Sequence, residues 1–207
     1  MSFIELLTKE LSNLPGEKAH KQFYPLRFES FSKPNNPRLS AVGVHLFKIN
    51  SEWHFILIER SEYDGHHSKQ IAFPGGKKDN TDLDLEQTAR RESEEEINIS
   101  MEFSQLIGQI TPVYIPVSNF EVFPFIFFHE NIPSFSRSEK EVSDIFLVKI
   151  TDLVNEKFIS KTNIRISDHT NLKDIPCFIF NDKIIWGATA LILSELKELI
   201  QRISNSF

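Results

Sequence analysis

The sequence predicts a mixed α/β (α+β) fold, in which short strands outnumber the helices but enclose at least two long ones. Runs rich in Val, Ile and Phe are separated by polar residues and prolines, a pattern typical of β-strands and their connections. Apolar residues recur with helical spacing in residues 3–13 and 188–203, and an acid-rich segment near residue 90 also has helical character. At 207 residues, the chain is long enough for one domain with a modest extension.

The first forty residues are expected to form a helix and an irregular arm. The helical pattern of residues 3–13 ends at Leu14-Pro15-Gly16, and residues 17–40 are polar and contain three prolines. We therefore divide the chain into an N-terminal helix and arm, residues 1–37, and a main domain, residues 38–207. The sequence leaves open whether the arm covers a site, contributes to a homodimer contact or extends freely.

The main domain is expected to begin with a β-hairpin and to end with a helix. Residues 41–47 and 53–59 are the predicted paired strands, and prolines 112, 116 and 124 should lie at strand ends or edges because Pro has no N–H to donate. The other predicted elements are a polar loop at 61–70, a short strand at 71–73, a helix capped by Thr81 or Asp82 and ending near Asn98, strands at 106–110, 122–128 and 145–148, a hairpin over 179–185, and an amphipathic helix at 188–203 with Glu195, Lys197 and Glu198 on its polar face.

Composition excludes several classes of protein. The pI is near 5.7 and no basic block is present, so nucleic acid is not an expected partner. No apolar run approaches the roughly 20 residues of a membrane span, and acids stand where a signal peptide would be apolar. A single cysteine, Cys177, excludes an internal disulfide and is expected to be a small buried apolar residue. These features predict a cytoplasmic protein with no membrane partner.

The acidity of the chain is concentrated in one short segment. Residues 79–96 carry eight acids against two bases, a net charge of −6, which equals the net charge of the whole chain. On a helix, Glu92, Glu95 and Glu96 share one face, where each pair repels by about 3–4 kcal/mol at an effective dielectric of about 20. A face of carboxylate oxygens suits Mg²⁺ or Mn²⁺. The alternative is a solvated face neutralised by Arg90 and Arg91.

The metal-binding interpretation is favoured by a turn that precedes the acid-rich helix, Phe73-Pro74-Gly75-Gly76. Residues 91–99, RESEEEINI, resemble the second half of the Nudix hydrolase box, R-E-U-x-E-E-x-G-U with U aliphatic. Ser93 replaces the first aliphatic residue, Asn98 replaces the glycine, and one extra residue separates the turn from Arg91.

Asp82 stands where that box has its upstream Glu, and this substitution and the longer spacing are similar to the coenzyme A pyrophosphatase branch. The stretch Leu57, Ile58, Arg60, Ser61 before the turn is also similar to that branch, although Gly65 and Lys69 replace an Arg and a Gly. With the downstream pieces YIPVSNFEVFPF and IIWGATALILSEL, the likeness spans roughly residues 38–200.

The resemblance implies a Nudix-type α/β/α sandwich, with a mixed sheet between helices, that hydrolyses a diphosphate linkage with Mg²⁺ or Mn²⁺. It implies that Glu92, Glu95 and Glu96 are metal ligands, with Glu92 a ligand or the general base. Arg91 is expected to pair with Asp82, which locks the helix to the loop, and to point away from the carboxylate face. Glu92, Glu95 and Arg91 are thus the expected catalytic set.

Substrate contacts are expected from Arg60, Gly75, Gly76 and His67, with Glu141 as an additional acid near the metal. Glycines at the turn let the backbone approach metal or phosphate. For Arg60, Glu141 and the histidine, an ordinary surface role is the alternative interpretation.

The implied substrate is small, a diphosphate resembling coenzyme A. Hydrolysis would convert coenzyme A or acyl-CoA to 3′,5′-ADP and (acyl-)4′-phosphopantetheine. ADP-ribose, dinucleotides, nucleoside triphosphates or a non-catalytic nucleotide-binding role are the alternatives.

Overall fold

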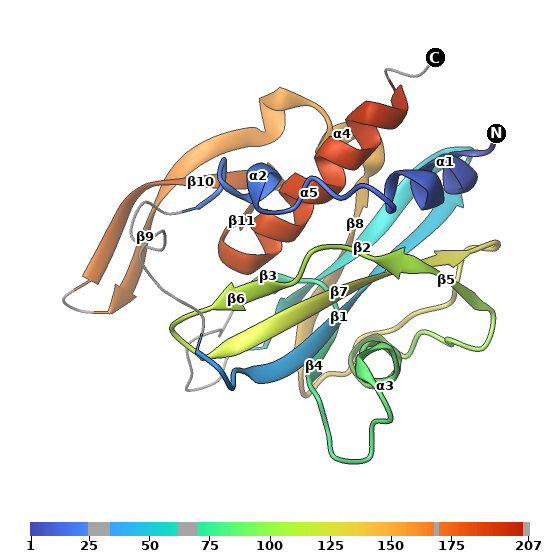
Figure 1. The fold of residues 1–207 in the computed structure, drawn as a ribbon, viewed down its shortest axis with the longest axis horizontal. Helices are drawn as coiled ribbons and strands as arrows, with labels where there is room; N and C mark the ends of the chain where they lie inside the picture. Colours follow the sequence, from blue (N-terminus) through green and yellow to red (C-terminus); the bar gives the residue numbers. More distant parts are fainter. Residues whose placement is uncertain (25–33, 62–69, 168–169, 205–207) are drawn as a thin grey trace.

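A mixed β-sheet lies between two layers of helices (Figure 1). The computed structural model describes residues 1–24, 34–61, 70–167 and 170–204. The helices are α1 (Phe3–Glu10), α2 (Glu17–His20), α3 (Leu85–Ile97), α4 (Ile150–Leu153) and α5 (Gly187–Ser204), with a 3₁₀ turn at Glu156–Phe158. The strands are β1 (Arg38–Ile49), β2 (Glu52–Arg60), β3 (Ile71–Ala72), β4 (Gly75–Lys77), β5 (Ser104–Gln109), β6 (Val113–Ile115), β7 (Phe120–His129), β8 (Val142–Lys149), β9 (Ile159–Ser167), β10 (Thr170–Phe180) and β11 (Lys183–Ile185).

Strand β1 is the centre of the main sheet. The order is β3-β2-β1-β7-β5, with β4 also paired to β1, β6 to β7 and β8 to β2. β1 runs parallel to β7 and antiparallel to β2 and β4, so the sheet is mixed. Strands β9, β10 and β11 form a second, three-stranded sheet. The predicted mixed α/β (α+β) fold is confirmed.

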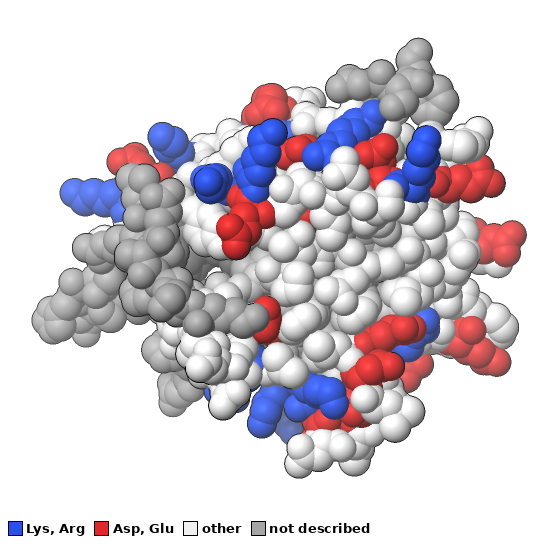
Figure 2. All heavy atoms as spheres, viewed as in Figure 1, with Lys and Arg blue, Asp and Glu red and all other residues white. Residues whose placement is uncertain are grey.

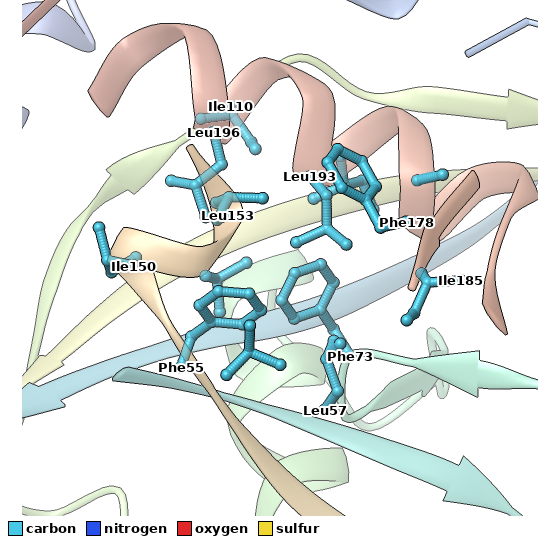
Figure 3. Packing of buried hydrophobic residues seen from close by; sticks show 14 of the residues in the cluster. Phe55, Leu57, Phe73, Ile110, Ile150, Leu153, Phe178, Ile185, Leu193 and Leu196 are labelled. Carbon is cyan, nitrogen blue, oxygen red and sulfur yellow. The ribbon is translucent and has the colours of Figure 1, made fainter. Parts of the chain in front are cut away.

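Two apolar clusters occupy the two faces of the main sheet. The larger joins β1, β2 and β7 to α1 and α5, and Figure 3 shows Leu193 and Leu196 of α5 facing Phe55, Phe73 and Leu153. The smaller cluster lies under α3, where Ala89 and Ile97 pack with apolar residues of β1, β2 and β7. Helix α3 is thus held against the face opposite α5.

Local sequence signals predicted both hairpins. The β1–β2 hairpin is confirmed, and Asn50 and Ser51 at its turn have φ of 49° and 68°, values that a two-residue hairpin turn requires. The hairpin at Asn181 and Asp182 is confirmed with similar angles, and Cys177 is buried as expected.

The prediction of an irregular arm over residues 17–40 was wrong in part. Residues 17–20 form helix α2, and β1 already begins at Arg38. The helix predicted at residues 3–13 ends at Glu10. Both α1 and α2 pack against α5.

The expected place of Pro124 at a strand end or edge was wrong. It lies in the interior of β7, between β1 and the β5/β6 side. The neighbouring chain passes from β5, whose Gln109 pairs with Phe125, to β6, whose Val113 pairs with Val122. The missing N–H of Pro124 therefore falls at a break in the ladder, while its carbonyl accepts from the N–H of Ile110 at 3.1 Å.

Helix α5 is not amphipathic in the predicted way, because Glu195 and Lys197 are buried. The Glu195 carboxylate accepts hydrogen bonds from the N–H of Gly16 at 2.9 Å and from the N–H and hydroxyl of Thr111 at 3.0 and 2.7 Å, and it lies 3.3 Å from Nε2 of His20. Burial alone would raise the pKa of Glu195, but these hydrogen bonds lower it below its usual value. Glu195 thus fastens the N-terminal segment to α5.

Strands β4, β6 and most of β9 and β10 were not predicted. Polar residues interrupt the apolar alternation of β9 and β10, and two glycines make β4 look like a turn. Within the described residues, no helix is long and apolar enough to cross a membrane.

Replacing Glu195 by Ala should lower the free energy of unfolding by at least about 3 kcal/mol, because several buried donors lose their acceptor. Denaturant unfolding measures this loss. Glu198→Ala is the control, since Glu198 forms a half-buried i,i+4 pair with Arg202 and should cost about 0.5 kcal/mol or less. Equal losses for the two variants would contradict the structural role of Glu195.

Candidate active site

Helix α3 carries the predicted carboxylates and is capped at both ends. Asp84 is the N-cap, and its side chain accepts from the N–H of Gln87 at 2.8 Å, so the prediction of Thr81 or Asp82 as the cap was wrong. Asn98 ends the helix in the left-handed conformation, as predicted. The helix buries one stripe of side chains, which includes Ser93 and Glu96.

The Gly75-Gly76 backbone forms the wall opposite α3. It belongs to β4, which pairs antiparallel with Ser40–Val42 of β1. Gly75 has a φ of +155°, and a Cβ there would lie 2.3 Å from the carbonyl oxygen of Ala41. A Cβ on Gly76 would lie 2.4 Å from the carboxyl group of Glu92. Gly75 therefore requires glycine, because its φ is positive and the backbone of β1 lies against it, whereas a side chain at Gly76 would displace the carboxyl group of Glu92.

Glu96 is the most buried of the three glutamates, with a side chain 1% exposed. Its carboxylate accepts from the N–H of Gly75 at 2.8 Å and forms an ion pair with Nη1 of Arg60 at 2.7 Å. Burial raises its pKa to about 7, although Arg60 and the Gly75 N–H oppose that change. Strands β2 and β4 and helix α3 therefore meet at the carboxylate of Glu96.

Glu92 and Glu95 share Arg91 as their cation. Nη1 of Arg91 donates to Glu92 at 2.8 Å and to Glu95 at 3.0 Å. Burial raises the pKa of Glu92, with Arg91 acting in the opposite direction. The Glu95 side chain is 54% exposed, whereas Glu92 lies against the loop. The predicted common face is therefore divided into two inward carboxylates and one outward carboxylate.

The expected pair between Arg91 and Asp82 is confirmed and is bidentate, with both N···O distances 2.9 Å. Asp82 is buried, also accepts from the hydroxyl of Thr88 at 2.9 Å, and has a pKa held well below its usual value, mainly by Arg91. The expectation that Arg91 points away from the carboxylates was wrong. Its guanidinium is wide enough to reach Asp82 on one side and Glu92 and Glu95 on the other.

Arg90 does not neutralise the glutamate face. Its guanidinium binds Glu86 and the Met101 carbonyl, and it lies 4.8 Å from the ring centroid of Phe127. On the face that Figure 2 shows, both acidic and basic side chains lie near the position of α3. The protein's own arginines therefore already balance part of the acidic segment.

Of the other predicted site residues, Arg60 and Glu141 lie near the three glutamates, and His67 is not among the described residues. Arg60, at the end of β2, points at Glu96, and the carbonyl of Glu141 accepts from the N–H of Ser61 at 2.9 Å. The negative charge of Glu141 contributes to the raised pKa of Glu92, so this acid lies close to the site. His67, and with it His66, Gly65 and Lys69, lies outside the described residues.

Sequence reasoning missed two hydrogen bonds that hold α3 in place. Thr88 supports Asp82 from inside the helix, a role that its spacing of six residues does not suggest. Ser93, noted only as a departure from the box, is hydrogen-bonded to His45 of β1. A polar residue at a helix position that packs on a sheet was the available signal for the second.

The oxygen donors suit a divalent cation, although they are not arranged as a complete site. Within residues 1–24, 34–61, 70–167 and 170–204, no group of three or more His, Cys, Asp or Glu side chains is placed to hold a metal ion. The acidic oxygens of Glu92 and Glu96 instead bind Arg91 and Arg60. A carboxylate whose pKa is raised by burial, beside two further carboxylates, is a donor set that Mg²⁺ or Mn²⁺ favours.

Comparison with known protein families identifies the class to which the chain belongs. A family model described as the NUDIX domain matches residues 37–169, and the chain belongs to that family. It is a pyrophosphohydrolase that acts on nucleotide derivatives.

Individual relatives agree with the family. The chain is 30% identical over 177 residues to a Nudix hydrolase NudL of Klebsiella pneumoniae, covering 84% of this chain and 89% of that protein. A NudL of Yersinia enterocolitica is 29% identical over 145 residues, or 70% and 73% of the two chains.

Solved structures share the fold at low identity. A Nudix hydrolase from M. smegmatis, RenU, matches with a TM-score of 0.55 and 12% identity, over 81% of this chain and 88% of that one. A C. elegans Ap4A hydrolase matches with a TM-score of 0.52 and 17% identity, over 82% and 99%. These likenesses concern the fold alone.

Replacing Asp82 by Asn should lower the free energy of unfolding at neutral pH by about 2 kcal/mol, because Arg91 loses its charged bidentate partner. The folded-state pKa of Asp82 is lowered, so its contribution is fully present above the ordinary Asp value near 4 and is lost as pH falls through the folded value. Between pH 6 and pH 2.5, the free energy of unfolding measured with urea should therefore fall less in the variant than in the wild type. Parallel pH profiles would contradict this account.

Proposed function

We propose that this chain is a Mg²⁺- or Mn²⁺-dependent pyrophosphohydrolase of coenzyme A or acyl-CoA. The observation that carries the proposal is the junction of α3 with β4, where Glu96 is buried against the N–H of Gly75 and Glu92 lies against Gly76. Two carboxylates with pKa values raised by burial lie against a glycine backbone. This is the chemistry of a cation site beside a phosphate.

The residues that would hold the cation are Glu92, Glu95 and Glu96. A divalent cation there would neutralise substrate charge and acidify a water molecule. Since Glu96 now pairs with Arg60 and Glu92 with Arg91, ligation requires these carboxylates to exchange one cationic partner for another. Nudix hydrolases generally use divalent metals, in agreement with this donor set.

The chain's own groups have distinct roles in the proposed reaction. Water attacks one phosphorus of the diphosphate, a new P–O bond forms, and the bridging P–O bond breaks to leave two phosphate monoesters. Glu92 accepts the proton of the attacking water or remains a ligand, and Arg60 binds a substrate phosphate oxygen. Arg91 and Asp82 hold the helix in place, while Gly75 and Gly76 allow close approach.

The coenzyme A assignment is supported by the sequence around the site. Asp82 in place of Glu, the longer spacing to Arg91 and the stretch from Leu57 to Ser61 are similar to that branch. Arg60, within that stretch, lies at the site and contacts Glu96. ADP-ribose, a dinucleotide or a nucleoside triphosphate is the alternative substrate, because Gly65 and Lys69 depart from the pattern of the branch.

Turnover of coenzyme A with Mn²⁺ tests the substrate. The assay should release 3′,5′-ADP and 4′-phosphopantetheine, and kcat/KM should exceed that for ADP-ribose, Ap4A and ATP. EDTA should abolish the reaction, and added Mn²⁺ should restore it. Rapid turnover of another diphosphate without turnover of coenzyme A would reject the substrate while retaining the reaction.

Replacing Glu96 by Gln should lower kcat at least about a hundredfold, because a ligand is lost while the acceptor for Gly75 remains. The folded state should persist by circular dichroism, since the change removes a buried charge. Glu94→Gln is the matched control on the same helix. The side chain of Glu94 is exposed, and its carboxylate accepts a hydrogen bond from the backbone N–H of Met101 at 3.2 Å. Equal activity of both variants would reject the metal-site assignment.

A further inference from the structure

A buried chain of polar side chains connects the sheet to the back of α3. Nε2 of His129 on β7 lies 3.1 Å from Nδ1 of His45 on β1, and Nε2 of His45 lies 2.9 Å from the hydroxyl of Ser93 on α3. The Ser93 hydroxyl in turn donates to the carbonyl of Ala89 at 2.6 Å. His45 and Ser93 are 0% exposed and His129 is 4% exposed. Three elements are thus joined by buried polar side chains.

One arrangement of protons satisfies this chain. The single hydroxyl proton of Ser93 is donated to Ala89, so Ser93 accepts from the Nε2–H of His45. Nδ1 of a neutral His45 then accepts from the Nε2–H of His129. Burial, the neighbouring His129 and Arg90 lower the pKa of His45 well below its usual value, which agrees with a neutral ring.

Gly43 allows this contact and also holds the opposite wall of the site. A Cβ on Gly43 would lie 2.6 Å from Nε2 of His45 and 2.8 Å from the Ser93 hydroxyl. The N–H of Gly43 donates to the carbonyl of Pro74 at 2.8 Å, directly before the Gly75-Gly76 backbone. In β1, His45 therefore binds α3, and Gly43 binds the segment Pro74–Gly76, which we call the glycine loop.

The side chain of Glu92 bridges the space between α3 and Gly76. Glu92 already lies so close to Gly76 that a Cβ would overlap its carboxyl group. An aliphatic residue at position 93 would fill space without fixing the rotation of the helix, whereas the bond from His45 is directional.

We propose that His45 is a positioning residue, which acts through Ser93 to hold α3 at the rotation and depth that place Glu92 and Glu96 opposite the glycine loop. This inference rests on the proposed function, because it concerns the affinity of the same carboxylates for a divalent cation. Groups that orient ligands in this way typically change metal affinity by about 10–100-fold when removed. His129 of β7 helps to orient His45 through the contact between its Nε2 and Nδ1 of His45.

Mn²⁺ affinity of the folded variants, measured by electron paramagnetic resonance, tests the proposal. His45→Asn and Ser93→Ala remove the bond and should weaken Mn²⁺ binding by about tenfold or more, with kcat lowered more than KM is raised. His45→Gln should largely restore affinity, because its amide N–H reaches the position of Nε2. Ser93→Ala keeps the test available if His45→Asn does not fold, since Ala favours the helix.

His54→Asn is the matched control. His54 is also buried on a strand, but its Nδ1 lies 2.9 Å from the carbonyl of Glu52, at the opposite end of β2 from Arg60. Its Mn²⁺ affinity should equal that of the wild type even where stability falls. Wild-type affinity in both His45→Asn and Ser93→Ala would overturn the positioning role, as would equal weakening in His54→Asn.

Imidazole ¹⁵N chemical shifts test the chain without metal or substrate. His45 should be neutral and protonated at Nε2 at pH 6, and a proton on Nδ1 would overturn the inference. A wild-type protein that binds no Mn²⁺ and hydrolyses no diphosphate would instead reject the proposed function. The two failures are therefore distinguishable.

Discussion

The site depends on the guanidinium of Arg91, whose five N–H donors all have acceptors. Nε and Nη2 bind Asp82, Nη2 also donates to the carbonyl of Lys77 at 3.2 Å, and Nη1 donates to Glu92 and Glu95. One cation thereby connects the helix, the loop before it and the end of β4. A lysine has neither the number nor the planar arrangement of donors to replace it.

Glu96 lies beyond this network and is held by different elements. Arg60 comes from the end of β2, and the N–H of Gly75 comes from β4, so the buried carboxylate connects strand, loop and helix. Burial still raises its pKa to about 7, which shows that these two donors do not fully offset its desolvation. The protein thus keeps a carboxylate whose charge a further cation would stabilise.

The sequence predicted features that depend on neighbouring residues better than those that depend on distant ones. The left-handed cap at Asn98 and the turn at Asn50 follow from residue type and position, and the pair between Arg91 and Asp82 spans nine residues. Glu195 looked solvent-exposed on its helix, because the groups that bury it belong to residues 16–20 and 111.

Contacts between residues distant in the sequence also limited the prediction of the candidate site and of the sheet. Pro124 is tolerated because of how two other strands meet beside it, and the partner of Ser93 lies 48 residues earlier in β1. Spacing predicted three carboxylates on one face of α3, whereas their division between Arg91 and Arg60 depends on side-chain directions that spacing does not fix. Residue type and period indicate which groups form the site; the tertiary fold determines which charge each group faces.

That division of charge bears on how an anionic substrate can enter. Arg60 and Arg91 face more carboxylates than they can neutralise, since Glu92, Glu95, Glu96 and Asp82 all bind one or the other. A diphosphate that binds Arg60 would leave Glu96 without its ion pair unless another cation replaces Arg60 at that carboxylate. Among the described side chains of this surface, the carboxylates outnumber the arginines that bind them, and a divalent cation at these glutamates would supply the missing positive charge.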